Sequence, residues 1–209
     1  MTSTIGILVF DDAEELDFVG PWEVFTMINE VSNRLNKTHL GKERAHNVIL
    51  VAEKMEPVHC AKAMRVLPDV TTADCPPLDV LLIPGGQGTR REAKNEQLLA
   101  WIAATAAQCR WITSVCTGAL LLTAAGPAKG KRVTTHWGFV EQLRQRGEAA
   151  EVLDNVRYVR DGNVVTAAGV SAGIDMALWL TGQLHTPALA RMVQRAMQYD
   201  PAPPYAAEV

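Results

Sequence analysis

Short apolar runs alternate with amphipathic stretches along the chain, which is typical of strands that alternate with helices. Four apolar runs predict strands, at residues 5–10, 47–52, 78–83 and 110–115, and residues 131–135 are expected to form a short strand. Helices are expected from Pro21, over 92–108, from Gly118, and over 136–143, 171–184 and 187–198. Nearly continuous apolar strands separated by helices indicate an α/β fold with a mostly parallel sheet and helices on both faces.

Other segments complete this layout. An Asp161-Gly162 turn between two strand-like runs predicts a hairpin over 158–166. Residues 59–70 alternate enough for short hairpin strands, although Pro57 and Pro68 limit their pairing. The polar stretch at about 29–44 is interpreted as a surface insertion before the second strand. No internal repeat or linker is visible, so residues 1–209 are expected to form a single domain.

Composition narrows the class of protein. With 209 residues and 48% hydrophobic content, the chain can bury roughly 70% of its unfolded surface in one core. A net charge of -3 without a basic stripe argues against nucleic acid as a partner. No apolar run approaches the roughly 18 residues of a membrane span, and the N-terminus has no basic region typical of a secretory signal. Four cysteines without a C-x-x-C pair fit a reducing cytoplasm, and no metal site is expected.

Cys116 is the strongest candidate for chemistry. It follows a β-branched and aromatic run and precedes an Ala/Leu-rich helix, so it lies on a strand-to-helix turn. Such a turn exposes its central side chain, and the positive helix end is expected to lower the pKa of a thiol. The alternative is an inert buried cysteine, which is the interpretation for Cys60, Cys75 and Cys109.

Further candidates follow other strands and should meet Cys116 in one crevice, because ligands bind outside the carboxyl ends of parallel strands. Asp17 follows the first strand and would be an acid/base whose pKa is raised by burial and by a nearby thiolate. The backbone N–H groups of Thr117 and of the Gly85-Gly86 loop are expected to form an anion-stabilising hole. The Thr117 hydroxyl is expected to position a water molecule.

Each of these candidates has a structural alternative. Asp17 would serve as the N-cap of a helix beginning near Pro21, and Gly85-Gly86 would be a plain turn. His136, at a helix start, is as well explained by a structural hydrogen bond as by a role in the pocket. Trp22 and Trp137 would either line the pocket or belong to the core.

Three motifs together resemble the DJ-1/PfpI superfamily, whose members resemble class I glutamine amidotransferase domains. These motifs are Ile83-Pro84-Gly85-Gly86, Ser114-Val115-Cys116-Thr117-Gly118 and Thr134-Thr135-His136-Trp137. Within the superfamily the sequence is most similar to the isocyanide hydratases. The segments that support this resemblance are 16–21, 72–80, 169–175 and 201–205.

The resemblance implies a flavodoxin-like sandwich that forms a homodimer and uses no cofactor. It implies that Cys116 attacks the terminal carbon of an isocyanide while Asp17 protonates that carbon. The resulting thioimidate would react with water to give an N-substituted formamide. Thr117 matches the threonine that follows the cysteine in this family, and Gly85, Gly86, His136 and Trp137 are the expected contacts of the small-molecule electrophile.

Alternatives within the superfamily remain. Peptidase-like members usually carry histidine where this chain has Thr117, and glyoxalase and chaperone-like members usually carry glutamate where it has Asp17. The same cysteine and histidine motifs occur in the N-terminal domains of AraC-type regulators. A ligand- or redox-sensing protein and a glyoxalase are therefore the alternatives to a hydratase, and the insertion at about 29–44 would reshape the pocket or the dimer contact.

Overall fold

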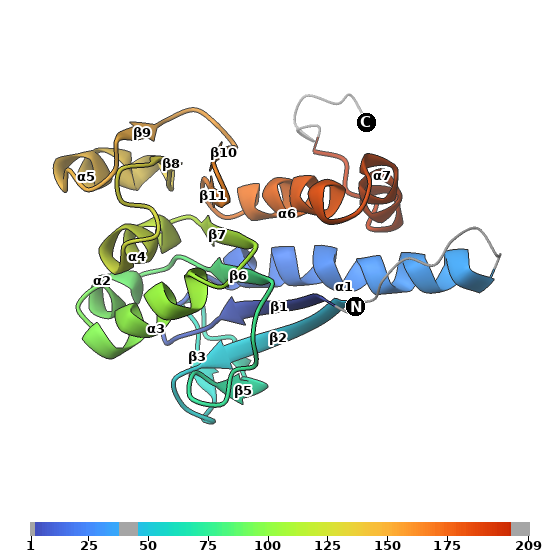
Figure 1. The fold of residues 1–209 in the computed structure, drawn as a ribbon, viewed down its shortest axis with the longest axis horizontal. Helices are drawn as coiled ribbons and strands as arrows, with labels where there is room; N and C mark the ends of the chain where they lie inside the picture. The colour runs from blue at the N-terminus through green and yellow to red at the C-terminus, as the bar shows by residue number, and fades with distance from the viewer. Residues whose placement is uncertain (1–2, 38–45, 202–209) are drawn as a thin grey trace.

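A seven-stranded sheet forms the centre of the molecule (Figure 1). The structure is a computed structural model, and it describes residues 3–37 and 46–201. Neighbouring strands are parallel, except that β10 pairs antiparallel with β11. In spatial order the strands are β10 (Tyr158–Asp161), β11 (Val164–Ala167), β7 (Trp111–Val115), β6 (Val80–Ile83), β1 (Ser3–Leu8), β2 (His46–Ala52) and β5 (Val70–Thr71).

The central strands are buried on both faces because helices cover each side of the sheet. Every residue of β6 and β7 is buried. On one face, helices α1 (Glu15–Lys37), α6 (Ala172–Leu184) and α7 (Pro187–Ala196) pack against one another. On the other lie α2 (Thr89–Glu92), α3 (Glu96–Ala106) and α4 (Gly118–Ala125). The predicted α/β sandwich is therefore confirmed.

Smaller elements surround this sandwich. Strands β3 (Val58–His59) and β4 (Arg65–Val66) form the expected short antiparallel hairpin. Strand β8 (Arg132–Thr134) pairs in parallel with β9 (Glu151–Leu153), which the sequence did not predict. A 3-10 turn (Trp137–Phe139) leads into α5 (Val140–Gln145). No helix in the described ranges is both long enough and apolar enough to span a membrane.

The start of α1 differs from the prediction. The helix begins at Glu15, so Pro21 lies inside it and Asp17 lies in its first turn instead of in a preceding loop. A proline inside a helix loses one backbone hydrogen bond. Burial of Phe18 and Phe25 on the face that packs against the core offsets this cost.

Two other predicted segments also differ. Residues 29–37, assigned to the polar insertion, are the last part of α1, whereas 38–44 lie outside the described residues. The amide of Asn29 bonds the backbone N–H and C=O of His46 at 2.7 and 2.9 Å, so this end of α1 is tied to β2. The helix expected over 92–108 is α3 and begins only at Glu96, because Asn95 caps it by accepting from the Leu98 N–H, and Glu92 is instead the last residue of α2.

The chain order places the candidate residues at one edge of the sheet. Strand β1 lies between β2 and β6, so the chain leaves its carboxyl end toward one side and later returns on the other. Ligand sites of open α/β sheets form at this kind of switch point. Asp17 follows β1, Gly85 follows β6 and Cys116 follows β7, and all three lie beyond the carboxyl ends of their strands.

Candidate active site

Cys116 lies on a strained turn between β7 and α4. Its φ angle is 56°, in the left-handed region that residues other than glycine rarely adopt. Three hydrogen bonds hold this conformation. The Cys116 N–H donates to the carbonyls of Ala167 and Ala168 at 3.1 and 2.9 Å, and the buried Thr135 hydroxyl donates to the Cys116 carbonyl at 2.8 Å. Strain that the surroundings maintain in this way is typical of active sites.

Gly85 is the point at which the candidate residues meet. A Cβ atom at this position would lie 2.5 Å from the Thr117 nitrogen and 2.8 Å from both Asp17 Oδ2 and Cys116 Cβ. Glycine is therefore required, because any other side chain would displace one of these groups. Three segments that are distant in sequence therefore meet here, and Asp17, Cys116 and Thr117 all approach the backbone of Gly85.

The Asp17 carboxyl group is fully buried. Its Oδ2 accepts a hydrogen bond from the Gly85 N–H at 2.8 Å, whereas Oδ1 is buried without a hydrogen bond of standard geometry. Burial raises the pKa of Asp17 to about 7, with a smaller contribution from the charge of Glu14. The Gly85 N–H and the thiol of Cys116 act in the opposite direction. Asp17 therefore holds or releases a proton near neutral pH, as the sequence predicts.

The pKa of Cys116 does not follow the prediction. Burial, together with the charge of Asp17, raises the pKa of this thiol to about 12, although the N–H and the hydroxyl of Thr117 lower it. The expectation that the helix end leaves a low-pKa thiolate is therefore wrong. Cys116 is only 7% exposed and lies beside a carboxylate, and both conditions raise its pKa by more than the positive end of α4 lowers it. At neutral pH the resting pair is a thiol beside a carboxyl group that titrates.

The glycine loop bonds to the protein itself. The Gly85 N–H donates to Asp17, and the Gly86 N–H donates to the Thr117 hydroxyl oxygen at 3.1 Å. Neither N–H is free to form the anion-stabilising hole that the sequence suggested. The loop instead holds the acid and Thr117 in place, and among the expected donors the Thr117 N–H is the one that lowers the pKa of Cys116.

His136 and Trp137 follow Thr135, whose hydroxyl bonds the Cys116 carbonyl. His136 is half-buried, accepts from the Gly138 N–H at 3.2 Å and packs against Gly169, where a Cβ atom would come within 2.3 Å of its ring. The Trp137 side chain is 83% exposed, so it does not belong to the core. No hydrogen bond joins His136 to Asp17 or Cys116 in the described part of the chain.

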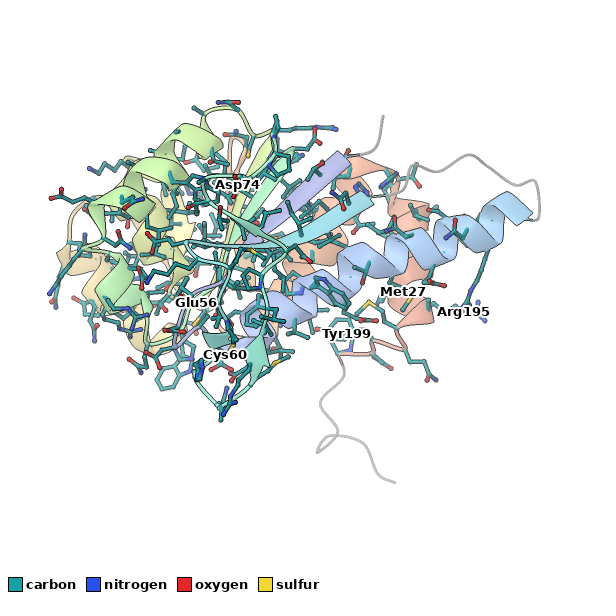
Figure 2. All side chains as sticks on the ribbon, turned by 90° about the horizontal axis from the view of Figure 1, so that it is seen from below. Met27, Glu56, Cys60, Asp74, Arg195 and Tyr199 are labelled. Carbon is teal, nitrogen blue, oxygen red and sulfur yellow. The ribbon has the colours of Figure 1, made fainter. Side chains whose placement is uncertain are left out.

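The other cysteines are separate from this site. Cys60, labelled in Figure 2, lies in the loop that joins β3 and β4. Burial raises the pKa of Cys60 to about 11 and that of Cys109 to about 12. All four cysteines are free. No group of three or more histidine, cysteine or acidic side chains in residues 3–37 and 46–201 is arranged to hold a metal ion.

Two buried threonines that contact the site are not apparent from the sequence. Thr135 fixes the carbonyl of Cys116, and Thr89 donates to the Gly86 carbonyl at 2.7 Å. Thr135 was part of a recognised motif, but its role depends on the turn geometry. Thr89 lies in a short polar stretch after the glycine loop, and nothing in its spacing indicates burial. These contacts follow from the fold and not from any local pattern.

Burial of Asp17 makes a prediction about stability. Its pKa is higher in the folded chain than the ordinary value of 3.8, so the folded state binds the extra proton and loses stability as pH rises from about 4 to 7. We expect Asp17→Asn to be more stable than the wild type, with an advantage that grows by roughly 2–3 kcal/mol between pH 5 and pH 8. Urea unfolding at both pH values measures it.

The matched control is Asp154→Asn, which removes a carboxylate from an exposed position. This control should show no comparable growth of stability with pH. An Asp17→Asn advantage that stays constant between pH 5 and pH 8 would show that the buried carboxyl group is ionised at both values.

Two known bacterial proteins are similar to this chain over most of its length. The chain is 40% identical over 205 residues to a Pseudomonas putida protein named isonitrile hydratase, and the match covers 98% of this chain and 82% of that protein. A crystal structure of a THiJ/PfpI family protein from Pseudomonas syringae superimposes with a TM-score of 0.85 and 33% identity. That alignment covers 100% of this chain and 80% of the other.

A regulatory protein is also similar. The transcriptional regulator GbdR of Pseudomonas aeruginosa is 25% identical over 197 residues, which is 94% of this chain and 51% of the regulator. This chain therefore spans about half the length of that relative. The model of the DJ-1/PfpI family matches residues 3–183, and we conclude that the chain belongs to the DJ-1/PfpI family.

Proposed function

We propose that this protein is an isocyanide hydratase, which adds water to an isocyanide to give an N-substituted formamide. The observation that carries the proposal is the convergence of the buried Asp17 carboxyl group and the Cys116 side chain at Gly85, where the Cys116 thiol acts on the pKa of Asp17. Asp17 gains or loses a proton near neutral pH, and Cys116 is a potential nucleophile. The 40% identity to isonitrile hydratase supports the same reaction.

The first step begins with Cys116 as a thiol and Asp17 as a carboxylate. Asp17 as a carboxylate accepts the proton of the Cys116 thiol while the sulfur attacks the terminal carbon of the isocyanide, and the same proton then passes to that carbon. The S–H bond breaks, one S–C and one C–H bond form, and the carbon–nitrogen triple bond becomes a double bond. The product is a thioimidate on Cys116. A raised thiol pKa is compatible with this step because the base lies beside the sulfur.

The second step consumes one water molecule. Its oxygen adds to the thioimidate carbon with one proton going to nitrogen, and the C–S bond then breaks as the other proton returns to sulfur through Asp17. The formamide leaves and the thiol is restored. We assign the placement of this water to the Thr117 hydroxyl. Contact with the substrate is assigned to Gly85 and Gly86, and to His136 and Trp137, which follow the residue whose hydroxyl bonds the Cys116 carbonyl.

Formation of the formamide tests this proposal. Purified protein incubated with an aryl isocyanide should release the formamide, measured by chromatography. Cys116→Ala should abolish release, and Asp17→Asn should lower kcat by at least about 100-fold because the proton shuttle is lost. For the wild type, kcat/KM should rise as pH increases through about 7, since Asp17 must be ionised to accept the thiol proton.

Two results would contradict the proposal. The first is formamide release by Cys116→Ala equal to that of the wild type. The second is the absence of release by the wild type from both aryl and alkyl isocyanides. Turnover of methylglyoxal would then favour a glyoxalase, whereas no turnover combined with oxidation of Cys116 by peroxide would favour a redox sensor.

We also propose a cytoplasmic homodimer. The free cysteines fit a reducing compartment, which keeps Cys116 as a thiol. Leu16 and Trp22 on α1 are 37% and 38% exposed, and large apolar side chains at a surface are candidates for burial against a second copy. Sedimentation equilibrium should give twice the chain mass of 22.8 kDa. A single-chain mass at micromolar concentration would contradict the dimer.

A further inference from the structure

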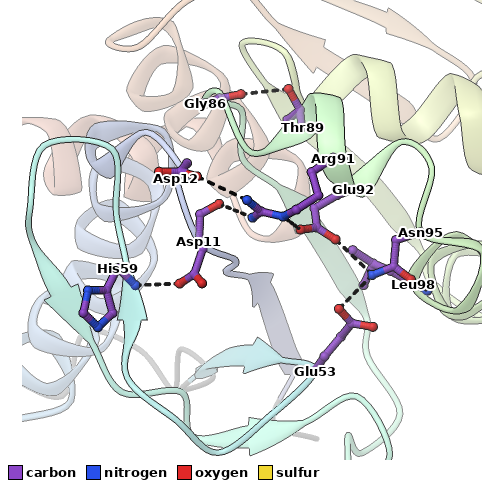
Figure 3. A network of polar contacts seen from close by, with 10 residues as sticks. All are labelled: Asp11, Asp12, Glu53, His59, Gly86, Thr89, Arg91, Glu92, Asn95 and Leu98. Carbon is purple, nitrogen blue, oxygen red and sulfur yellow. Dashed lines mark hydrogen bonds and ion pairs between the residues drawn. The ribbon is translucent and has the colours of Figure 1, made fainter.

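Arg90 presents a cationic group beside the glycine loop of the candidate active site. It is the second residue of α2, its side chain is exposed, and Nη1 donates to the Gly86 carbonyl at 2.9 Å and to the Thr89 hydroxyl oxygen at 3.2 Å. Figure 3 shows the bond between Thr89 and Gly86 at the start of the helix that carries Arg90. The Thr117 hydroxyl bonds the same carbonyl at 3.2 Å, so the guanidinium group and the residue after Cys116 share one acceptor.

An aromatic ring holds the guanidinium group from another side. Its central carbon lies 4.8 Å from the ring centre of Phe139, which is a cation–π distance. Phe139 is 7% exposed and ends the 3-10 turn that begins at Trp137. Arg90 therefore bridges the glycine loop and the turn that follows His136, the two segments assigned above to substrate contact. A cation held in this way loses little further conformational entropy when it binds an anion.

The neighbouring Arg91 has quite different surroundings. Its guanidinium group pairs with Asp12 at 3.2 Å and with Glu92 at 2.7 Å, and it also donates to the Asp11 carbonyl (Figure 3). Among the ion pairs of the described residues, none includes Arg90. Both hydrogen bonds of Arg90 use Nη1, so its Nε–Nη2 edge has no protein acceptor in the part of the chain that the structure describes.

The Nε–Nη2 edge of arginine matches one kind of ligand. One N–H of each nitrogen points in the same direction, and the two together bind both oxygens of a carboxylate. The Gly86 carbonyl would keep the Thr89 hydroxyl as a donor at 2.7 Å without Arg90, so this carbonyl does not depend on the guanidinium group. The positive charge of Arg90 is thus available for a ligand instead of being needed to hold the loop.

We propose that Arg90 is a specificity-determining residue that binds a carboxylate on the substrate, so that the preferred isocyanides carry a negative charge. This inference rests on the proposed function. The isocyanide group would face Cys116 and Asp17, whereas the carboxylate at the other end of the molecule would bind the Nε–Nη2 edge. Because this contact is distant from the reacting carbon, it contributes to binding and affects KM more than kcat. The same separation limits repulsion between the carboxylate and Asp17.

The experiment measures selectivity for a charged substrate. Formamide release from 3- and 4-isocyanobenzoate is compared with release from the corresponding isocyanobenzamides, which have nearly the same shape without the charge. For the wild type, kcat/KM should be about five- to tenfold higher for the benzoate in at least one isomer pair, because a charge-assisted hydrogen bond at an exposed site contributes at about this level. High salt should reduce this ratio, since the arginine is exposed.

Variants of Arg90 separate recognition from a structural role, which would lower turnover of both substrates together. Arg90→Gln removes the charge but keeps a side-chain donor for the Gly86 carbonyl, and it should abolish the preference by raising KM for the benzoate. Arg90→Lys keeps the charge without the forked geometry and should retain part of the preference. The matched control is Arg110→Gln, which removes an exposed arginine at the amino end of β7, on the opposite edge of the sheet, and should leave the ratio unchanged.

Two results would overturn the inference while leaving the proposed reaction intact. The first is equal kcat/KM for benzoate and benzamide in both isomer pairs, and the second is a preference that Arg90→Gln retains. If the wild type releases no formamide from any of these substrates, the proposed reaction falls and binding alone tests Arg90. Benzoate should then slow alkylation of Cys116 by iodoacetamide more than benzamide does, in the wild type but not in Arg90→Gln. Equal protection by benzoate and benzamide would overturn the carboxylate site.

Discussion

The site depends on the burial of one carboxyl group against one thiol. Asp17 and Cys116 come from segments about a hundred residues apart, and the absence of a side chain at Gly85 lets them meet. Burial raises both pKa values, so the pair carries a proton at neutral pH that neither group would hold so firmly in water. Burying the two groups together lowers the stability of the fold, and the arrangement persists because the surrounding helices and the sheet fix both backbones.

The backbone around the pair fixes the positions of Asp17, Cys116 and Thr117. The strained Cys116 turn is held by β11 and by Thr135, and the glycine loop uses its N–H groups to hold Asp17 and Thr117. A thiol with a raised pKa and a base in contact differs from the preformed thiolate of many cysteine enzymes. In the reaction proposed above, proton transfer and attack would occur together, which suits a substrate whose terminal carbon receives both the sulfur and the proton.

The sequence predicted the parts of this arrangement that follow from local patterns and chain order. Apolar runs located the strands, and the carboxyl-edge rule brought Asp17, Gly85 and Cys116 together. It failed where burial decides the outcome. Pro21 lies inside α1 because burial of the neighbouring apolar side chains stabilises the helix by more than the loss of one backbone hydrogen bond destabilises it. The pKa of the Cys116 thiol rises because the effect of burial is larger than the opposite effect of the positive helix end. Thr89 was missed for the same reason.

The infrared S–H stretching band of Cys116 tests the central claim most directly. The difference between the wild type and Cys116→Ala isolates this band from those of the other three cysteines. With the thiol retained beside a titrating Asp17, the band should persist at pH 8 and shift in position as the carboxyl group loses its proton near pH 7. A band that is already absent at pH 6 would mean a resting thiolate and would contradict the shared-proton pair.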